Sequence, residues 1–352
     1  MKILSLFDGM SCGQLAIDRI GIKNYTYYAS EIDKYAIKIA KKNFPNTIHL
    51  GDVTSIKAGK LPKIDLLIGG SPCQGFSFVG SQLAFDDPRS KLFFEYVRLL
   101  KELEPKYFML ENVRMKKEYL DIITEYLGVE PILINSSLFS AQNRQRYYWT
   151  NIPFNKNIID KGIVLKDILE TNMEYVKNGK QGDYLACDYD GKPKQVGIAT
   201  DINGHDILKR VYSLEGKSPT INTMNGGNRE PKVMVKSYRE VRTEEAKKLR
   251  KEIRLSTGKD HTPFRSKELV EREDGKVGTT TPSLNNDHKI SLTKDITQDI
   301  YWRKLTPLEC ERLQTVPDNY TEGVSNTQRY KMLGNGWTVD VISHIFNHLT
   351  KE

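Results

Sequence analysis

Ile3-Leu4-Ser5-Leu6-Phe7-Asp8-Gly9-Met10-Ser11-Cys12-Gly13, near the start of this 352-residue chain, is the stretch that decides the fold class. Ile3–Phe7 is a short apolar run, which is typical of a buried strand in a parallel sheet. The glycine-containing turn that follows it leads into a helical pattern, as in a nucleotide-type pocket. The stretch lacks Gly-x-Gly-x-x-Gly, the turn that cradles phosphates, and this counts against a dinucleotide ligand.

Further short apolar runs and helical patterns alternate through the first 150 residues. The runs predict strands at Tyr25–Ser30, Ile64–Ile68 and Tyr107–Leu110, and the helical spacing predicts helices at Asp33–Asn43 and Leu92–Leu103. This alternation indicates an α/β domain with a mostly parallel sheet. Polar residues repeatedly follow the ends of the strands, at the edge where open α/β sheets bind their ligands.

The texture of the sequence changes after about residue 155. Residues 171–300 are rich in Lys, Asn, Gly, Thr and Asp, and the charged stretch Tyr238–Arg254 is a candidate surface helix. Helices return at Leu305–Leu313, where Thr306 and Pro307 form a start signal, and at Val339–Leu349. We expect one domain from residues 1–155 plus 327–352 and a smaller, irregular one from residues 156–326.

Composition limits the class of protein. The formal net charge of +8 fits a polyanionic partner or, equally, a solvated basic surface. The four cysteines form no C-x-x-C pair and no set with metal-ligand spacing, so we expect no metal site and a reducing compartment. Neither a signal peptide nor a membrane-length apolar run is evident, and we expect a cytoplasmic protein that does not bind membranes.

The segment Gly70-Ser71-Pro72-Cys73-Gln74-Gly75-Phe76-Ser77 carries the strongest chemical signal. A lone cysteine is usually buried and behaves as a small hydrophobe. Cys73, however, follows a predicted strand and lies among glycines that allow the backbone to approach a ligand closely. The setting favours a nucleophile.

This segment resembles the Pro-Cys motif of the cytosine-5 DNA methyltransferase family, and the other motifs occur in that family's order. They are Phe7-Asp8-Gly9-Met10-Ser11-Cys12-Gly13, Glu31-Ile32-Asp33, Gly51-Asp52-Val53, Arg89-Ser90-Lys91-Leu92-Phe93-Phe94, Glu111-Asn112-Val113, Gln142-Asn143-Arg144-Gln145-Arg146, Arg303–Gln314 and Gly334-Asn335. The resemblance implies a Rossmann-like, S-adenosylmethionine-dependent methyltransferase fold plus a target-recognition domain, in a stand-alone enzyme of the bacterial or phage type.

The resemblance also implies the catalytic residues. Cys73 would add to carbon 6 of cytosine as a thiolate, and Glu111 would supply a proton or a hydrogen bond at N3. Arg144 would hold the carbonyl oxygen of the base, with Arg146 supporting the site. Because the two arginines alternate on a predicted strand, both can point to one face.

S-adenosylmethionine, which contains no phosphate, is the implied cofactor. Glu31 would bind the ribose hydroxyls and Asp52 the adenine amino group, with Ile32 and Val53 flanking the ring. The full implied set is Phe7, Asp8, Gly9, Met10, Ser11, Glu31, Ile32, Asp52, Val53, Pro72, Leu92, Asn335 and Trp337. Trp337 departs from the family, in which valine is common near this position, and it resembles the eukaryotic de novo branch.

Double-stranded DNA is the implied partner, because a cytosine must leave the base stack before a thiolate can reach carbon 6. Ser77–Arg89 resembles the family's mobile loop. Within it, Ser77 would contact DNA, Val79 would enter the vacated space and Arg89 would contact a phosphate. Residues 171–300 would read the target sequence, and Arg229 and Arg265 are candidate DNA contacts there.

Two alternatives compete with this interpretation. The transfer RNA branch of the family generally has Thr where Phe76-Ser77 stands and has a smaller middle region, and both features favour DNA. A catalytically dead homologue would usually have lost a key group, whereas Cys73, Glu111, Glu31 and Asp52 are all present. We expect a monomer, and the sequence leaves open whether a cognate restriction enzyme accompanies it.

Overall fold

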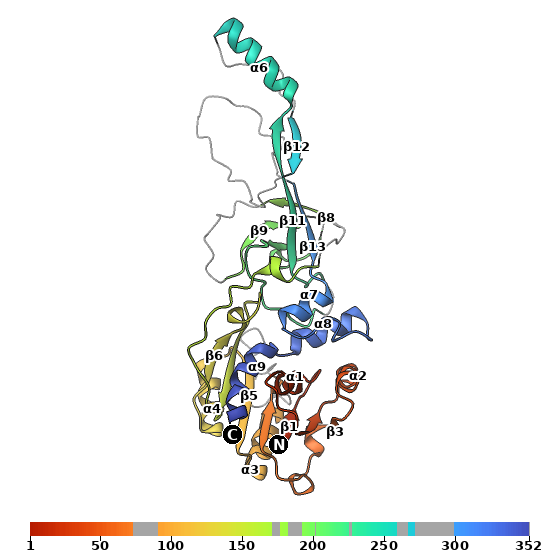
Figure 1. The fold of residues 1–352 in the computed structure, drawn as a ribbon, viewed down its shortest axis with the longest axis vertical. Helices are drawn as coiled ribbons and strands as arrows, with labels where there is room; N and C mark the ends of the chain where they lie inside the picture. The colour runs from red at the N-terminus through yellow and green to blue at the C-terminus, as the bar shows by residue number, and fades with distance from the viewer. Residues whose placement is uncertain are drawn as a thin grey trace. The chain divides into compact units, whose positions relative to one another are not determined.

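The computed structural model describes residues 1–72, 91–170, 177–181, 192–200, 202–224, 227–258, 267–271 and 299–351. Its contacts divide the chain into two compact units (Figure 1). The first comprises Met1–Leu169, Lys217–Arg229 and Thr306–Glu352, and the second comprises Glu170–Gly216 and Glu230–Leu305.

A seven-stranded sheet forms the centre of the first unit, in the order β3-β2-β1-β4-β5-β7-β6. The strands are β1 (Lys2–Leu6), β2 (Thr26–Ser30), β3 (Ile48–Gly51), β4 (Leu66–Gly69), β5 (Tyr107–Val113), β6 (Ile132–Asn135) and β7 (Gln145–Thr150). The first five strands are parallel, and β7 runs antiparallel to both of its neighbours. The predicted α/β fold with a mostly parallel sheet is confirmed.

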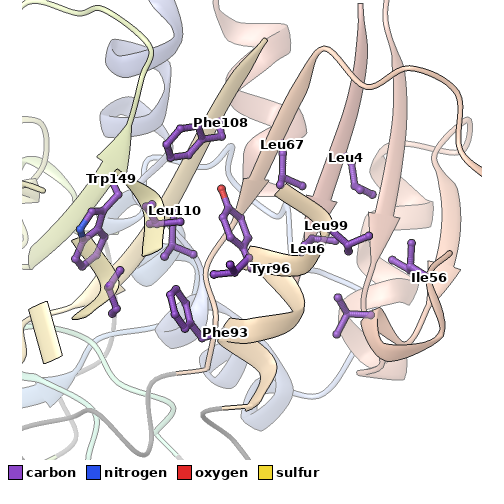
Figure 2. Packing of buried hydrophobic residues seen from close by; sticks show 14 of the residues in the cluster. Leu4, Leu6, Ile56, Leu67, Phe93, Tyr96, Leu99, Phe108, Leu110 and Trp149 are labelled. Atoms are coloured by element: carbon purple, nitrogen blue, oxygen red, sulfur yellow. The ribbon is translucent and has the colours of Figure 1, made fainter. Parts of the chain in front are cut away.

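One face of this sheet packs against helices α3 (Lys91–Leu103) and α4 (Lys117–Leu127). Figure 2 shows Phe93 and Tyr96 of α3 lying beside Leu67 and Leu110 of the sheet, with Trp149 at one side of the cluster. All five side chains are buried. Burial of this apolar surface is a main contribution to the stability of the first unit.

Helix α1 (Cys12–Arg19) lies on the opposite face of the sheet. Strand residues alternate between faces, so Leu67 contacts the α3 cluster while Ile68 points toward Gly13 of α1. Helix α9 (Val339–Phe346) packs against α1. Helix α2 (Lys34–Asn43) follows β2, and the Asp33 side chain caps its N-terminus.

Helices α7 (Pro307–Leu313) and α8 (Asn326–Asn335) precede α9 along the chain. Thr306 and Glu309 form the capping box at the start of α7, which confirms the helix start predicted from Thr306-Pro307. The carboxylate of Glu311 is fully buried and forms an ion pair with Arg329 of α8, with 2.9 Å between Oε1 and Nη2. This contact ties α7 to α8 and so holds α8 in place.

The second unit is a six-stranded sheet in the order β10-β9-β8-β13-β11-β12, with an additional pairing of β10 with β11. This extra pairing closes β8, β9, β10, β11 and β13 into a ring. The elements are β8 (Lys177–Gln181), β9 (Gln195–Ile198), α5 (Asp206–Lys209), β10 (Arg210–Tyr212), β11 (Lys232–Arg242), α6 (Glu244–Thr257), β12 (Lys267–Glu271) and β13 (Asp299–Lys304).

The stretch Tyr238–Arg254 differs from the single surface helix that its charges suggested. Residues 238–242 belong to β11, where they pair with β12, and helix α6 begins only at Glu244. Thr243 separates the two elements because its hydroxyl caps the helix by accepting the N–H of Ala246 at 3.3 Å. A charge-rich sequence alone did not distinguish a strand from a helix.

The two units also divide the chain differently from the boundaries expected at residues 155 and 326. Residues 156–169, 217–229 and 306–326 cluster with the first unit. Particular contacts account for this clustering: α7 is bonded to α8, and Lys217 is buried among carbonyl groups of the first unit. Across the residues that the structure describes, no helix is long and apolar enough to cross a membrane.

Candidate active site

The turn after β1 forms one wall of a cavity of about 750 Å³ at the carboxyl edge of the sheet. Phe7, Gly9 and Ser11 all have positive φ, near 60°, which is an uncommon conformation for the two that are not glycine. The turn is held by Asp8 N–H, which donates to Ser30 O at 3.0 Å, and by Gly9 N–H, which donates to Glu31 Oε2 at 2.7 Å. The strained turn therefore depends on the end of the neighbouring strand.

Glu31 and Asp52, at the ends of β2 and β3, present carboxylates to the same cavity. Glu31 Oε1 accepts the N–H groups of Ile32 and Asp33, both at 2.8 Å. One oxygen of Asp52 accepts the backbone and hydroxyl groups of Thr54, and these bonds lower the pKa of Asp52. These hydrogen bonds hold both side chains in place and leave further lone pairs of their oxygens for a ligand.

Glu111, at the end of β5, is buried and is held from two sides. Arg146 Nε of β7 lies 3.0 Å from Oε1, and the indole N–H of Trp337 donates to Oε2 at 3.1 Å. The cavity thus contains a carboxyl group with one charged and one neutral donor. Because donors hold both of its oxygens, this carboxyl group has a defined orientation. It can accept a hydrogen bond from a polar ring in the cavity or, when protonated, donate one to it.

Arg144 immediately precedes β7 and lies in a different setting from Arg146. Its guanidinium is buried and donates to the carbonyl groups of Ile221 at 3.1 Å, Gly334 at 3.1 Å and Gly336 at 3.0 Å. Burial, together with the nearby charge of Arg146, lowers the pKa of Arg144 to about 9, so it stays positive at neutral pH. This arginine joins three segments of backbone.

One of these segments, Lys217–Met224, is far from the others in sequence and is here called the inserted segment. The ammonium group of Lys217 is fully buried and donates to the carbonyl groups of Ser137, Ser140 and Ile163 at 2.6–3.2 Å. Ser218 bonds to the backbone of Ala141 and of Asn143. The inserted segment therefore braces the loop from which Arg144 and Arg146 emerge.

Asp8 lies at the cavity wall, where it accepts hydrogen bonds from Tyr27 at 2.8 Å and from Ser11. Burial raises the pKa of Asp8 from 3.8 to about 6, and the bonds from Ser11 and Tyr27 only partly offset this effect. Burial also raises the pKa of the neighbouring Cys12 thiol to about 12. Cys12 is therefore an inert thiol despite its place beside the cavity.

Most of the predicted site residues that the structure describes line this one cavity. They are Phe7, Asp8, Gly9, Glu31, Ile32, Asp52, Val53, Pro72, Leu92, Glu111, Arg144, Arg146, Asn335 and Trp337. Met10 and Ser11 do not: both are buried behind the turn, where Met10 O accepts the Tyr320 hydroxyl and the Ser11 hydroxyl bonds Asp8. Arg229 is exposed and also lies apart from the cavity lining.

Several other predicted residues, among them Cys73, Ser77, Val79, Arg89 and Arg265, lie outside the described residues. Pro72, which directly precedes Cys73, is at the cavity wall. Across the described ranges no cluster of His, Cys, Asp and Glu is suited to hold a metal ion.

The structure adds site residues that the sequence did not single out. Lys331 of α8 lines the cavity and pairs with Asp33, with 2.6 Å between Nζ and Oδ2. Asn112 follows Glu111 and donates to the Ser71 hydroxyl at 3.3 Å. Asn112 and Ser71 stood inside quoted motifs and could have been named, whereas Lys331 gave no local signal because its partner is distant in sequence.

A family model described as C-5 cytosine-specific DNA methylase matches residues 1–351. The chain belongs to this family. The match confirms the resemblance and the enzyme class expected from the motifs, and it extends through the middle region where no motif was specific.

Curated relatives agree with this assignment along the whole chain. The orphan methyltransferase M.SPRI of Bacillus phage SPR is 30% identical, and M.Rho11sI of Bacillus phage rho11s is 29% identical. Each alignment covers 99% of this chain and 97% of the relative. A type II methyltransferase of Lactococcus lactis, M1.ScrFI, is 29% identical over 98% of this chain and 76% of its own.

Solved structures share the fold. The methyltransferase EhMeth of Entamoeba histolytica is 18% identical with a TM-score of 0.64, and the coverage is 100% of this chain and 98% of that one. A DNMT2 variant of Spodoptera frugiperda is 19% identical with a TM-score of 0.58, and 99% of each chain is covered. At these identities the likeness concerns the fold alone, and it agrees with the predicted methyltransferase fold.

Proposed function

We propose that this enzyme transfers a methyl group from S-adenosylmethionine to carbon 5 of a cytosine that is flipped out of duplex DNA within a short target sequence. One observation carries the proposal. Glu111, held by Arg146 and Trp337, shares a cavity with the carboxylates of Glu31 and Asp52. The proposed base-facing acid and the proposed nucleoside-binding carboxylates therefore line one cavity.

The charges of the cavity fit this cofactor. Five carboxylates line it, against three cations that are already engaged: Lys331 with Asp33, Arg146 with Glu111, and Arg144 with backbone carbonyls. S-adenosylmethionine carries a sulfonium and an ammonium group against one carboxylate, so a surplus of negative charge favours it.

Particular residues would hold each part of the cofactor. Glu31 would accept the ribose hydroxyls, and the free oxygen of Asp52 would accept the adenine amino group. Ile32, whose side chain is 75% exposed, offers an apolar surface to the adenine ring. When bound, S-adenosylmethionine supplies an electrophilic methyl group, with S-adenosylhomocysteine as the leaving group.

Cys73 is the proposed nucleophile. Its thiolate forms a bond to carbon 6 of cytosine, and the electrons of the 5,6 double bond make carbon 5 nucleophilic while Glu111 supplies a proton or hydrogen bond at N3. After methylation, carbon 5 loses its hydrogen as a proton and the bond from sulfur to carbon 6 breaks, which restores the thiolate. Cys12 and Cys310, the cysteines within the described residues, are both buried and unsuited to this role.

The geometry supports roles for Arg144 and Arg146 that differ from those implied by the family resemblance. Arg146 lies against Glu111, so we propose that Arg146 contacts the carbonyl oxygen of the base. The guanidinium of Arg144 donates to three backbone carbonyl groups. We propose that Arg144 has a structural role and holds these backbone segments in place around the site.

Recognition of the target is proposed from the chemistry of the reaction. Carbon 6 is inaccessible inside a base pair, so the cytosine must be extruded. Ser77, Val79, Arg89 and Arg265 remain candidate DNA contacts from the sequence, and exposed Arg229 remains one as well. Two phage relatives that align over 97% of their length are named orphan methyltransferases, which favours an enzyme without a cognate restriction partner. That the enzyme acts as a monomer remains a proposal from the sequence.

The test is to incubate the purified protein with labelled S-adenosylmethionine and a long mixed-sequence duplex, and to map modified cytosines by conversion sequencing. We expect carbon-5 methylation within one short recurring sequence. A parallel reaction contains transfer RNA. Label in that RNA and none in DNA would overturn the DNA assignment, and label in neither would contradict catalysis by the chain alone.

A further inference from the structure

Trp337 lies between α8 and α9 and lines the cavity of the proposed site. Its side chain is 8% exposed and lines the cavity, while its indole N–H donates to Oε2 of Glu111 at 3.1 Å. The residues it joins are far apart in sequence. One side chain therefore forms part of the cavity wall and also bonds the proposed catalytic carboxyl group.

The indole ring is confined by glycines on two other elements. A β-carbon added to Gly70, at the end of β4, would lie 3.0 Å from the indole nitrogen, and one added to Gly13 of α1 would lie 3.3 Å from Cζ3. The β-carbon at Gly70 would also come within 3.1 Å of Glu111 Oε2. Close contact with the backbone leaves the ring little freedom, so its N–H has a fixed direction.

Among the described residues, Glu111 has few other restraints. Arg146 holds Oε1, and the terminal torsion of a glutamate is otherwise broad. Without the indole N–H, Oε2 would be a buried acceptor without its donor, at the very oxygen that must be oriented toward the base. Two donors on opposite oxygens define the carboxyl plane, whereas one donor does not.

We infer that Trp337 is a positioning residue: its indole N–H orients the carboxyl group of Glu111, and its ring makes that orientation sensitive to the occupancy of the cofactor side of the cavity. This inference rests on the proposed function. It assigns Trp337 a role in the methyl-transfer step, beyond the cofactor contact that the family resemblance implied.

A first measurement needs no activity. The chain has three tryptophans, so protein labelled with nitrogen-15 at the indole gives three indole N–H signals, and Trp337→Phe identifies the one from Trp337. In the protein without ligand, Glu111→Gln should shift this signal and speed its exchange with solvent. Added S-adenosylmethionine should shift it too, while the Trp149 signal, whose donor bonds Thr124 in the core, stays in place.

A second measurement compares kinetics. Trp337→Phe keeps a ring and removes the donor, and we expect kcat to fall by roughly tenfold, the effect of one hydrogen bond, with the KM for S-adenosylmethionine changed by less than about threefold. Because the indole acts through Glu111, Trp337→Phe should cost little more in a Glu111→Gln background. Trp149→Phe, which deletes an indole bond outside the cavity, is the matched control, with urea unfolding measured for every variant.

The outcomes separate the two claims. An unmoved Trp337 signal in Glu111→Gln overturns the inference whatever the activity. Equal kcat in wild type and Trp337→Phe, or effects of the two substitutions that simply multiply, reduces Trp337 to a space-filling residue and also overturns it. A wild-type protein that methylates no cytosine contradicts the proposed function. It also contradicts the role of Trp337 in methyl transfer, even if the hydrogen bond to Glu111 is present.

Discussion

Burial of Asp8 at the cavity wall makes its contribution to the stability of the fold depend on pH. Its pKa is raised to about 6 in the folded protein against 3.8 for an ordinary carboxyl, chiefly by burial. The folded state therefore binds the proton more tightly than the unfolded state. The contribution of Asp8 to the free energy of unfolding should therefore fall as the pH rises from about 4 to about 6 and then stay reduced.

Asp8→Asn removes this ionisation and keeps an acceptor for Tyr27. We expect the variant to be more stable than wild type at pH 8, by roughly 1–3 kcal/mol, and the difference to vanish near pH 4. Urea unfolding at both pH values measures it. Asp52→Asn is the control of opposite sign, because the bonds from Thr54 lower the pKa of Asp52. A gain for Asp8→Asn that is equal at both pH values would contradict the burial argument.

At the scale of residues, the sequence identified which side chains meet but not what each one contacts. Glu31, Asp52, Glu111 and Arg146 line one cavity as expected, because each stands at the end of a strand or in a strand that faces that edge. The separate settings of Arg144 and Arg146 depend on the inserted segment, whose approach left no periodic signal. The residues that line the cavity were therefore easier to predict from the sequence than the contacts that each of them makes.

At the scale of elements, those with a local sequence signal were predicted and those without one were missed. Strands β1, β2 and β4 and helices α2 and α3 fall within one or two residues of their predicted bounds, because buried strands and amphipathic helices have local signatures. The strand at residues 238–242 was missed because its charge-rich sequence suits either structure. The inserted segment was missed because its place depends on partners more than 50 residues away in the sequence.

Gly334 shows how tightly the inserted segment is packed. A β-carbon there would lie 2.1 Å from the carbonyl oxygen of Asn222 and 2.7 Å from the backbone nitrogen of Thr223. Both contacts are with backbone, which cannot rotate away. Although alanine is normally favoured over glycine in a helix such as α8, the clash should decide the outcome.

We expect Gly334→Ala to lower the free energy of unfolding by roughly 1–3 kcal/mol and to reduce activity, because Arg144 bonds the carbonyl of Gly334. Urea unfolding and methyl transfer measure the two effects. Gly59→Ala is the matched control, since a β-carbon there meets nothing within 4 Å. A Gly334→Ala protein as stable and active as the Gly59→Ala protein would show that the inserted segment can move aside freely.

At the scale of the whole molecule, the net charge of +8 is the feature that DNA binding would use. Each phosphate that a lysine or arginine neutralises releases counterions, so affinity for duplex DNA should fall by at least about tenfold between 50 and 200 mM salt. Fluorescence anisotropy with a labelled duplex measures this dependence. A flat response would mean that the basic charge is merely solvated surface.

The most direct test of the central claim is covalent trapping on the mapped target sequence. The target cytosine is replaced by 5-fluorocytosine, whose carbon 5 cannot lose a proton after methylation, so the bond between sulfur and carbon 6 should persist. With S-adenosylmethionine, we predict a denaturant-stable complex of enzyme and duplex whose mass includes one added methyl group, and none with Cys73→Ser. A complex that forms equally well with Cys73→Ser would contradict the account, as would an active wild-type enzyme that forms no complex.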